Sequence, residues 1–306
     1  MLKSRFVLMA AVAIALGVAP ALAHDSVQGT FTRKLQVSGT ANLEVYTRSG
    51  DVTIRTGPAG AIEITGKIHV GDHWLSKRTD DIAELEENPP IRQDGSRVKI
   101  DYVPYHNISV DYEITVPADT VVRSETGSGN QTADGLKAGF QGHAGSGDIQ
   151  LDNIGGEIRV ETGSGNITGR SLAGPLTLQA GSGDIRIEEV GSGDVKAGTG
   201  SGNVEIRGVN GGARAETGSG NVDLEGKPAG SWYVQTSSGN AEVNVPQDAA
   251  FDLEVSTGSG TINVDHPLTT TIQGRVESPN KHISGKVRGG GPTITVHTGS
   301  GDVRIR

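Results

Sequence analysis

The sequence has 306 residues, with 46 glycines, 4% aromatic residues and no cysteine. Without cysteine, disulfides and a lipid-modified N-terminal cysteine are excluded. The formal net charge of −9 at pH 7 disfavours nucleic acid and anionic membrane surfaces as partners.

The N-terminus, residues 1–23, has the features of a secretory signal peptide. Lys3 and Arg5 form the charged start, residues 6–18 are apolar, and residues 21–23 form an A-x-A cleavage site. The apolar run is shorter than the about 20 residues that a membrane-spanning helix needs. We therefore expect an exported protein, periplasmic, on the cell surface or extracellular, with no transmembrane segment after signal removal.

The next region, residues 24–124, shows strand-like alternation of apolar residues without a fixed repeat. Strands are predicted at residues 31–37, 43–46, 52–55, 62–70, 98–103 and 110–116. One helix is predicted near residues 74–87, because its apolar residues fall on one face: Trp74, Leu75, Ile82 and Leu85. Stacked β structures expose unpaired strand edges at their ends, so we expect this helix to cover such an end. A partner-binding helix is the alternative.

From residue 125 to 306 the chain repeats a Ser-Gly-Asp/Asn-aliphatic motif. The Asp or Asn positions recur at steps of 18, 18, 18, 19, 18 and 19 residues: Asn130, Asp148, Asn166, Asp184, Asn203, Asn221 and Asn240. Thr261 takes the same place 21 residues later, and Asp302 takes it 41 residues after that, about two periods. A fixed period predicts stacked, nearly identical units. We expect these units to continue residues 24–124 within one domain.

Each unit contains two short segments of alternating apolar residues separated by glycine-rich turns. Ile149 and Leu151 flank Gln150, and Ile158 and Val160 flank Arg159 in the same way. This period of two predicts two short half-buried strands per unit, with glycine supplying positive φ at the corners. The predicted fold is therefore all-β: a right-handed parallel β-solenoid with coils of 18–19 residues, plus the one helix in its N-terminal half.

The C-terminal segment, residues 302–306, reads as a strand still in register with the repeat. We expect it to be the exposed last strand, with Arg304 and Arg306 as charges that discourage edge pairing. The alternative is that it adds a strand to another molecule, which would give end-to-end self-association. Residues 266–292 interrupt the period and predict a decorated coil with an excursion.

The repeated Thr-Gly-Ser-Gly-Asp/Asn core, preceded by the segment 112–117, resembles a bacterial family of exported β-strand-repeat proteins that are proposed adhesins, a domain of unknown function. The resemblance covers about residues 30–306. It implies a β-solenoid at the cell envelope and a role in adhesion. The family has no established catalytic residues, so the resemblance assigns none here.

The column of Asp and Asn positions has two interpretations. The preferred one is a structural ladder at the corners of the coils: Asn130, Asp148, Asn166, Asp184, Asn203, Asn221, Asn240 and Asp302. The alternative is a calcium-dependent secreted β-roll, whose glycine- and aspartate-rich repeats look similar. Its ligands would be Asp148, Asp184, Asp194 and Asp302. Calcium needs six to eight oxygens, and most half-units lack a second acid, so the ladder is favoured.

Catalytic and other metal sites find little support. His69, Asp72 and His73 lack a third histidine or cysteine partner, and we expect exposed histidines there. Glu188 and Glu189 are adjacent and face opposite sides of a strand, and 4% aromatic residues are too few to line the groove of a polysaccharide-processing β-helix enzyme, the least favoured alternative. We therefore predict no catalytic residue and no cofactor. The expected function is a binding or structural module with an envelope or surface partner, protein or polysaccharide.

Overall fold

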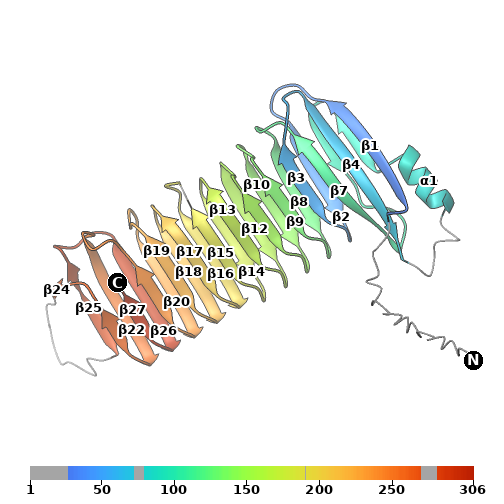
Figure 1. The fold of residues 1–306 in the computed structure, drawn as a ribbon. Helices are drawn as coiled ribbons and strands as arrows, with labels where there is room; N and C mark the ends of the chain where they lie inside the picture. The colour runs from blue at the N-terminus through green and yellow to red at the C-terminus, as the bar shows by residue number, and fades with distance from the viewer. Residues whose placement is uncertain (1–26, 72–78, 190, 270–280) are drawn as a thin grey trace, which may run out of the picture.

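The computed structural model describes residues 27–71, 79–189, 191–269 and 281–306. Within these residues the chain forms two long sheets that lie face to face along one stack (Figure 1). Each regular coil contributes one strand to each sheet, as the two-strand repeat predicts. Neighbouring coils pair in parallel, for example β11 (Ile149–Asp152) with β13 (Ile167–Leu172). The predicted parallel β-solenoid is confirmed.

The strands of the two sheets follow in spatial order. Sheet A contains β1 (Gly29–Gln36), β4 (Ala61–Val70), β7 (Ile108–Val116), β3 (Val52–Thr56), β9 (Gln131–Asp134), β11, β13, β15 (Ile185–Glu189), β17 (Val204–Val209), β19 (Val222–Gly226), β21 (Ala241–Asn244), β27 (Val303–Ile305) and β23 (Ile262–Val264). Sheet B contains β24 (Leu268–Thr269), β25 (His282–Val287), β22 (Phe251–Ser259), β26 (Thr293–Ser300), β20 (Trp232–Ser238), β18 (Ala213–Ser219), β16 (Val195–Ser201), β14 (Leu176–Ala180), β12 (Glu157–Thr162), β10 (Gly139–Ala144), β8 (Val121–Thr126), β2 (Asn42–Thr47), β6 (Arg97–Ile100) and β5 (Ile91–Asp94).

The core lies between the sheets and follows the predicted alternation. Ile149 and Leu151 point inward from sheet A, and Ile158 and Val160 point inward from sheet B; all four are at most 1% exposed. The buried apolar side chains form one cluster that runs through the stack. Since each buried aliphatic contributes roughly 1.5–3 kcal/mol, stacking supplies the burial that no single coil has.

The glycines of the repeat are required mainly by close stacking. A Cβ at Gly165 would overlap the carbonyl of Gly147 in the coil before it, and Gly183 stands in the same relation to Gly165. Neither Gly165 nor Gly183 has a positive φ. The expectation that corner glycines serve positive φ is therefore wrong at these two positions, where the backbones approach too closely for a side chain. It holds at the opposite corner of the coils, where Gly156 and Gly174 have φ values of 71° and 134°.

The threonine of the repeat is buried at the same corner. Thr162 is 2% exposed, and its Oγ1 donates to the carbonyl oxygen of Gly147 at 2.9 Å. Thr199 makes the equivalent bond to Gly183 at 2.8 Å. Buried hydroxyls need such partners. The Thr-Gly-Ser-Gly motif is thus a corner in which one coil is bonded to the coil before it.

The N-terminal end departs from the parallel pattern. β1 pairs antiparallel with β4, β4 pairs antiparallel with β7, and β5 pairs antiparallel with β6. The predicted strands are all present, and β5 was not predicted. The parallel arrangement predicted for the fold therefore does not extend to this end of the stack.

A single helix within the described residues, α1 (Thr79–Glu87), packs against β1 at this end of sheet A (Figure 1). Ile82 and Leu85 are buried. The Glu86 carboxylate accepts a hydrogen bond from the edge N–H of Thr30 at 2.7 Å. Arg33 donates to two carbonyls at the helix C-terminus, which satisfies groups that a helix end leaves unpaired. The helix covers the edge of β1, as predicted.

The helix is shorter than the predicted residues 74–87, since α1 begins at Thr79. The predicted apolar contributions of Trp74 and Leu75 lie outside the described residues. Among the residues that the structure describes, no helix has the length and hydropathy to cross a membrane.

The C-terminal strand is not at the end of the stack. β27 lies between β21 and β23, and β26 lies between β20 and β22. The expectation of an exposed last strand at residues 302–306 is therefore wrong. Arg306 instead forms an ion pair with Glu242 at 3.0 Å. Residues 266–292 contain β24 and β25, and after this excursion the chain returns to form β26 between β20 and β22. At this end, the outermost described strands are β23 and β24.

Candidate functional site

The predicted Asp/Asn column is hydrogen-bonded from coil to coil. The Oδ1 of Asn130 accepts the backbone N–H of Asp148 at 3.0 Å, and the Oδ1 of Asp148 accepts that of Asn166 at 2.7 Å. The same bond recurs between Asn166 and Asp184, Asp184 and Asn203, Asn203 and Asn221, Asn221 and Asn240, Asn240 and Asp302, and Asp302 and Thr261. Asp51 and Asp111 extend the column at its other end.

The four candidate calcium ligands are placed apart. Asp148 and Asp184 share the ladder corner, with the coil of Asn166 between them. Asp194 lies on the turn from sheet A to sheet B and accepts the N–H of Gly212 at 2.9 Å. The Thr261 N–H and hydroxyl donate to Asp302, and these bonds lower the pKa of that carboxyl. In the described part of the chain, no three His, Cys, Asp or Glu side chains are grouped to hold a metal ion. The calcium-dependent β-roll stays the alternative to the structural ladder, and melts with calcium and with EDTA would distinguish the two.

The histidine pair is only partly described, because Asp72 and His73 lie outside the described residues. We expected His69 to be exposed, but its side chain is only 12% exposed, and its Nε2 lies 3.0 Å from a carboxylate oxygen of Asp111. β4 and β7 bring these two side chains together across the sheet.

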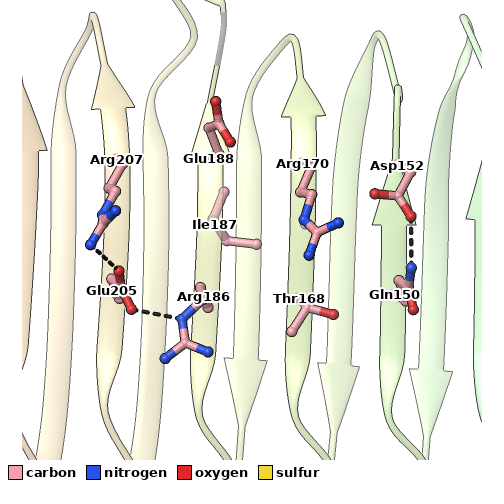
Figure 2. Close-up of a pocket in the computed structure, with 10 residues that line it drawn as sticks. Gln150, Asp152, Thr168, Arg170, Arg186, Ile187, Glu188, Glu205 and Arg207 are labelled. Carbon is pink, nitrogen blue, oxygen red and sulfur yellow. Dashed lines mark hydrogen bonds and ion pairs between the residues drawn. The ribbon is translucent and has the colours of Figure 1, made fainter.

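The outer face of sheet A is a charged surface (Figure 2). Arg186 and Arg207 both pair with Glu205, at 2.7 and 2.6 Å. Gln150 donates to Asp152 at 2.8 Å on β11, two strands away from Arg186 in sheet A (Figure 2). The residues around them line a depression of about 240 Å³. Its charged groups largely satisfy one another, which is typical of a solvated sheet face.

Sheet A offers no exposed aromatic ring on its described strands. Its two aromatic residues, Phe31 and Tyr112, are buried with ring centroids 6.3 Å apart. Burial raises the pKa of Tyr112 well above its usual value. This face therefore lacks the amphipathic rings that commonly anchor a ligand.

The outer face of sheet B, which we call the aromatic face, differs in this respect. Near its N-terminal end the rings of Tyr46 and Tyr102 lie 5.8 Å apart. Lys99 lies 5.1 Å from the Tyr46 ring centroid, and Arg48 lies 5.6 Å from that of Tyr102. Tyr102 is 44% exposed. A depression of about 440 Å³ beside it is also lined by His143 and other residues. We call Tyr46, Tyr102, Lys99 and Arg48 the first aromatic cluster.

The loop that carries Tyr102 is anchored at two residues that follow it, Val103 and Tyr105. Arg48 donates to the carbonyl of Val103 at 3.1 Å, and Val103 is buried. Tyr105 donates to Glu84 of α1 at 2.6 Å. An exposed ring on a loop held this way loses little conformational entropy when it binds a ligand.

A second aromatic cluster lies on the same face, on β18, β20 and β26. Arg214 lies 4.5 Å from the ring centroid of Tyr233, and the His297 ring lies 5.9 Å from it. The Tyr233 hydroxyl donates to Gln235 at 2.5 Å. Gln235 also lines a depression of about 450 Å³ that lies over Gly198.

Gly198 marks this depression as an open place in an otherwise filled column. Its outward position pairs with Gln179 and Glu216 in the neighbouring strands. A Cβ there would meet no atom closer than 4.0 Å. In contrast to Gly165, the backbone does not require glycine at this position, and its effect is to leave a gap between polar side chains.

Between β8 and β18, strand register places most charges of the aromatic face in two columns. One column carries cations: Arg123, Arg159, Lys196 and Arg214. The neighbouring column carries acids: Glu125, Glu161 and Glu216. Two ion pairs join the columns, Arg123 with Glu125 and Arg214 with Glu216, and Arg159 pairs with Glu157 on its own strand. The face is therefore close to neutral along its length.

Sequence reasoning did not identify the aromatic face. The low aromatic content argued against any aromatic-lined site, but content says nothing about where the rings gather. The available signal was local: Tyr102 and Tyr105 are two of the five tyrosines and lie three positions apart in the sequence. Only the parallel pairing of β2 with β6 and β8 brings Tyr46 to the same surface.

A family model described as Toastrack DUF4097 matches residues 40–306. Three solved structures are similar to this chain. A proposed cell adhesion protein from Clostridium sporogenes has 12% identity and a TM-score of 0.28, with 90% of this chain and 98% of that chain covered. A proposed adhesin from Parabacteroides distasonis has 12% identity and a TM-score of 0.47, with 92% and 98% covered. A proposed adhesin from Bacteroides fragilis has 14% identity and a TM-score of 0.34, with 91% and 98% covered. Among curated proteins, none matches the sequence.

Proposed function

The chain belongs to the Toastrack DUF4097 family, and we propose that it is an exported, non-catalytic binding module of the cell envelope with an adhesin-like role. Export is supported by the signal-peptide features of residues 1–23. A binding role is supported by a surface built from equivalent positions in successive coils. Such a surface repeats one contact many times, whereas catalysis needs a few unlike groups that converge.

The observation that carries this proposal is the placement of both aromatic clusters on one face. Tyr46 lies on β2 and Tyr233 on β20, seven strands further along sheet B. At about 4.8 Å per strand this places the clusters roughly 34 Å apart. The opposite face, on sheet A, has no exposed aromatic ring on its described strands. The arrangement suits an extended partner that contacts both clusters.

Two contacts on one partner bind more tightly than either alone, because the second contact forms at a high effective concentration. The coils between the clusters fix their separation, so the partner need not order them. This accounts for a long rigid stack in a protein whose individual contacts are modest.

The proposal can be tested with fluorescently labelled residues 24–306 and isolated cell envelopes of a producing bacterium. We expect saturable binding that falls when Tyr102→Ala and Tyr233→Ala are combined. The matched control is Gln150→Ala on the outer face of sheet A, which should bind as the unmodified chain does. Absence of envelope binding, or equal loss in the control, would contradict the proposal.

A further inference from the structure

We infer that the aromatic face binds an uncharged linear glycan. The inference rests on the proposed function above and names the ligand class for the same surface. The rings, the polar groups and the charge balance of the face all favour this ligand class.

The rings supply the apolar part of such a site. Tyr102 is 44% exposed and is one of three large hydrophobic side chains that are exposed among the described residues. The apolar C–H face of a sugar ring packs against an aromatic ring, and tyrosine also presents a hydroxyl for hydrogen bonding. Tyr233 offers a second ring further along the face. Two separated rings suit a chain of sugar units.

The polar groups suit a ligand rich in hydroxyls. Beside Tyr233, the depression over Gly198 is lined by Gln179, Glu216 and Gln235. Amide and carboxylate side chains together donate to and accept from hydroxyl groups. The gap at Gly198 leaves these groups accessible, because no side chain fills the position between them.

The charge balance disfavours a polyanion. Lys99 pairs with Asp101 at 2.7 Å, and Arg214 pairs with Glu216 at 2.6 Å. Lys99 and Arg214 are therefore already neutralised by carboxylates of the same face, while Arg48 beside Tyr102 donates to the carbonyl oxygen of Val103. The net charge of −9 adds long-range repulsion toward a polyanion. A neutral glycan needs no unpaired cation, and the net charge of the protein does not repel it.

A folded protein partner fits the face less well. Protein interfaces are centred on a packed apolar patch, whereas the exposed large hydrophobic side chains of this face are Tyr102 and Val121 in the part of the chain that is described. The rest of the face is made mainly of the columns of charged and polar side chains described above. A narrow polymer that follows these columns needs no such patch.

The test uses residues 24–306 and a panel of neutral glycans: α-glucan, β-1,3-glucan, β-1,4-glucan, mannan, xylan and chitin oligosaccharides. Polygalacturonate serves as the acidic comparison. We expect at least one neutral glycan to bind, with a dissociation constant that changes less than about threefold as salt rises from about 0.05 to 0.5 M. Tyr102→Ala and Tyr233→Ala should each weaken binding about tenfold.

Tyr102→Phe, which keeps the ring, should retain most of the binding, and Gln150→Ala on sheet A should leave it unchanged. Circular dichroism melts of each variant confirm that the fold is intact. Binding to none of the neutral glycans, or salt-sensitive binding confined to polygalacturonate, would overturn the inference. If envelopes still bind through Tyr102 and Tyr233 in that case, the ligand class is wrong while the proposed function stands.

Discussion

The backbone N–H of Asp302 donates to the side-chain Oδ1 of Asn240 at 2.9 Å, across 62 residues of sequence. Asp302 in turn accepts the N–H of Thr261, which precedes it in the chain. In space, the ladder therefore passes from Asn240 to Asp302 and then to Thr261. The last coil of the sequence therefore lies between two coils that precede it in the chain and is not at the end of the stack.

This insertion predicts a large effect of C-terminal truncation. Removing residues 293–306 deletes β26 and β27, which bury Ile294, Val296, Val303 and Ile305. Each buried aliphatic contributes roughly 1.5–3 kcal/mol, and the coils on both sides would lose their partner. We expect the melting temperature to fall by about 10 °C or more. Were the last coil terminal, a chain ending at residue 292 would melt close to the full-length protein.

The close approach of backbones between coils predicts a large loss of stability on substitution at one glycine and a small change at another. Gly165→Ala places a methyl group against the carbonyl of Gly147, and it should cost about 3 kcal/mol or more of unfolding free energy. Gly198→Ala meets open space and should change stability by less than about 1 kcal/mol. Denaturant unfolding of the two variants measures the contrast. Similar losses in both variants would contradict close approach to Gly147 as the reason for glycine at position 165.

The Asp/Asn ladder predicts a modest and local contribution to stability. In Asn166→Ala the N–H of Asp184 loses its 3.0 Å acceptor, which should cost about 1 kcal/mol because the group remains accessible to water. The matched control is Asn210→Ala, an exposed asparagine outside the ladder. Chemical denaturation with and without calcium separates the ladder from a metal site. A loss that appears only in calcium would favour ligation over the ladder.

Two carboxyl groups should respond to pH in opposite directions. Burial, with Glu242 and Glu205 nearby, raises the pKa of Asp223, so its contribution to stability is present below its unfolded pKa and lost as pH rises through the folded value. Asp223→Asn should therefore raise the melting temperature at pH 7 and leave it unchanged in acid.

The stability contribution of Asp302 should depend on pH in the opposite direction, because the hydrogen bonds from Thr261 lower its pKa. Its contribution is present above the unfolded pKa and lost as pH falls through the folded value. Asp302→Asn should lower the melting temperature at neutral pH, with a difference that shrinks in acid. Melts of both variants from about pH 3 to 7 cover the unfolded Asp pKa of about 3.9. Parallel pH profiles for the two would contradict these environments.

Much of the fold follows from the sequence because its information is local and periodic. The spacing of Asn130 to Asn240 sets the coil length, and alternation such as Ile149 and Leu151 sets the strands. The family resemblance noted in the sequence is confirmed by the match to residues 40–306. The order of coils could not be read this way, because the motifs at Thr261 and Asp302 are alike and either fits the place beside Asn240.

The candidate site was harder to predict, because it depends on register between distant strands. Tyr46, Tyr102 and Tyr233 are scattered in the sequence, and only stacking places them on one face. The buried role of Thr162 was also missed, since threonine next to glycine reads as a turn. In contrast, the Asp/Asn column from Asn130 to Asp302 could be located because its members share one local motif, whereas Asp111 lacks that motif and joins the column only through the fold.

The most direct test of the binding face is hydroxyl-radical footprinting of residues 24–306 with and without isolated envelopes. The account predicts that Tyr102 and Tyr233 lose reactivity on binding, while side chains on the outer face of sheet A, such as Gln150 and Arg170, keep theirs. Protection of the sheet A face with unchanged Tyr102 and Tyr233 would contradict it and move the binding surface to the charged side of the stack.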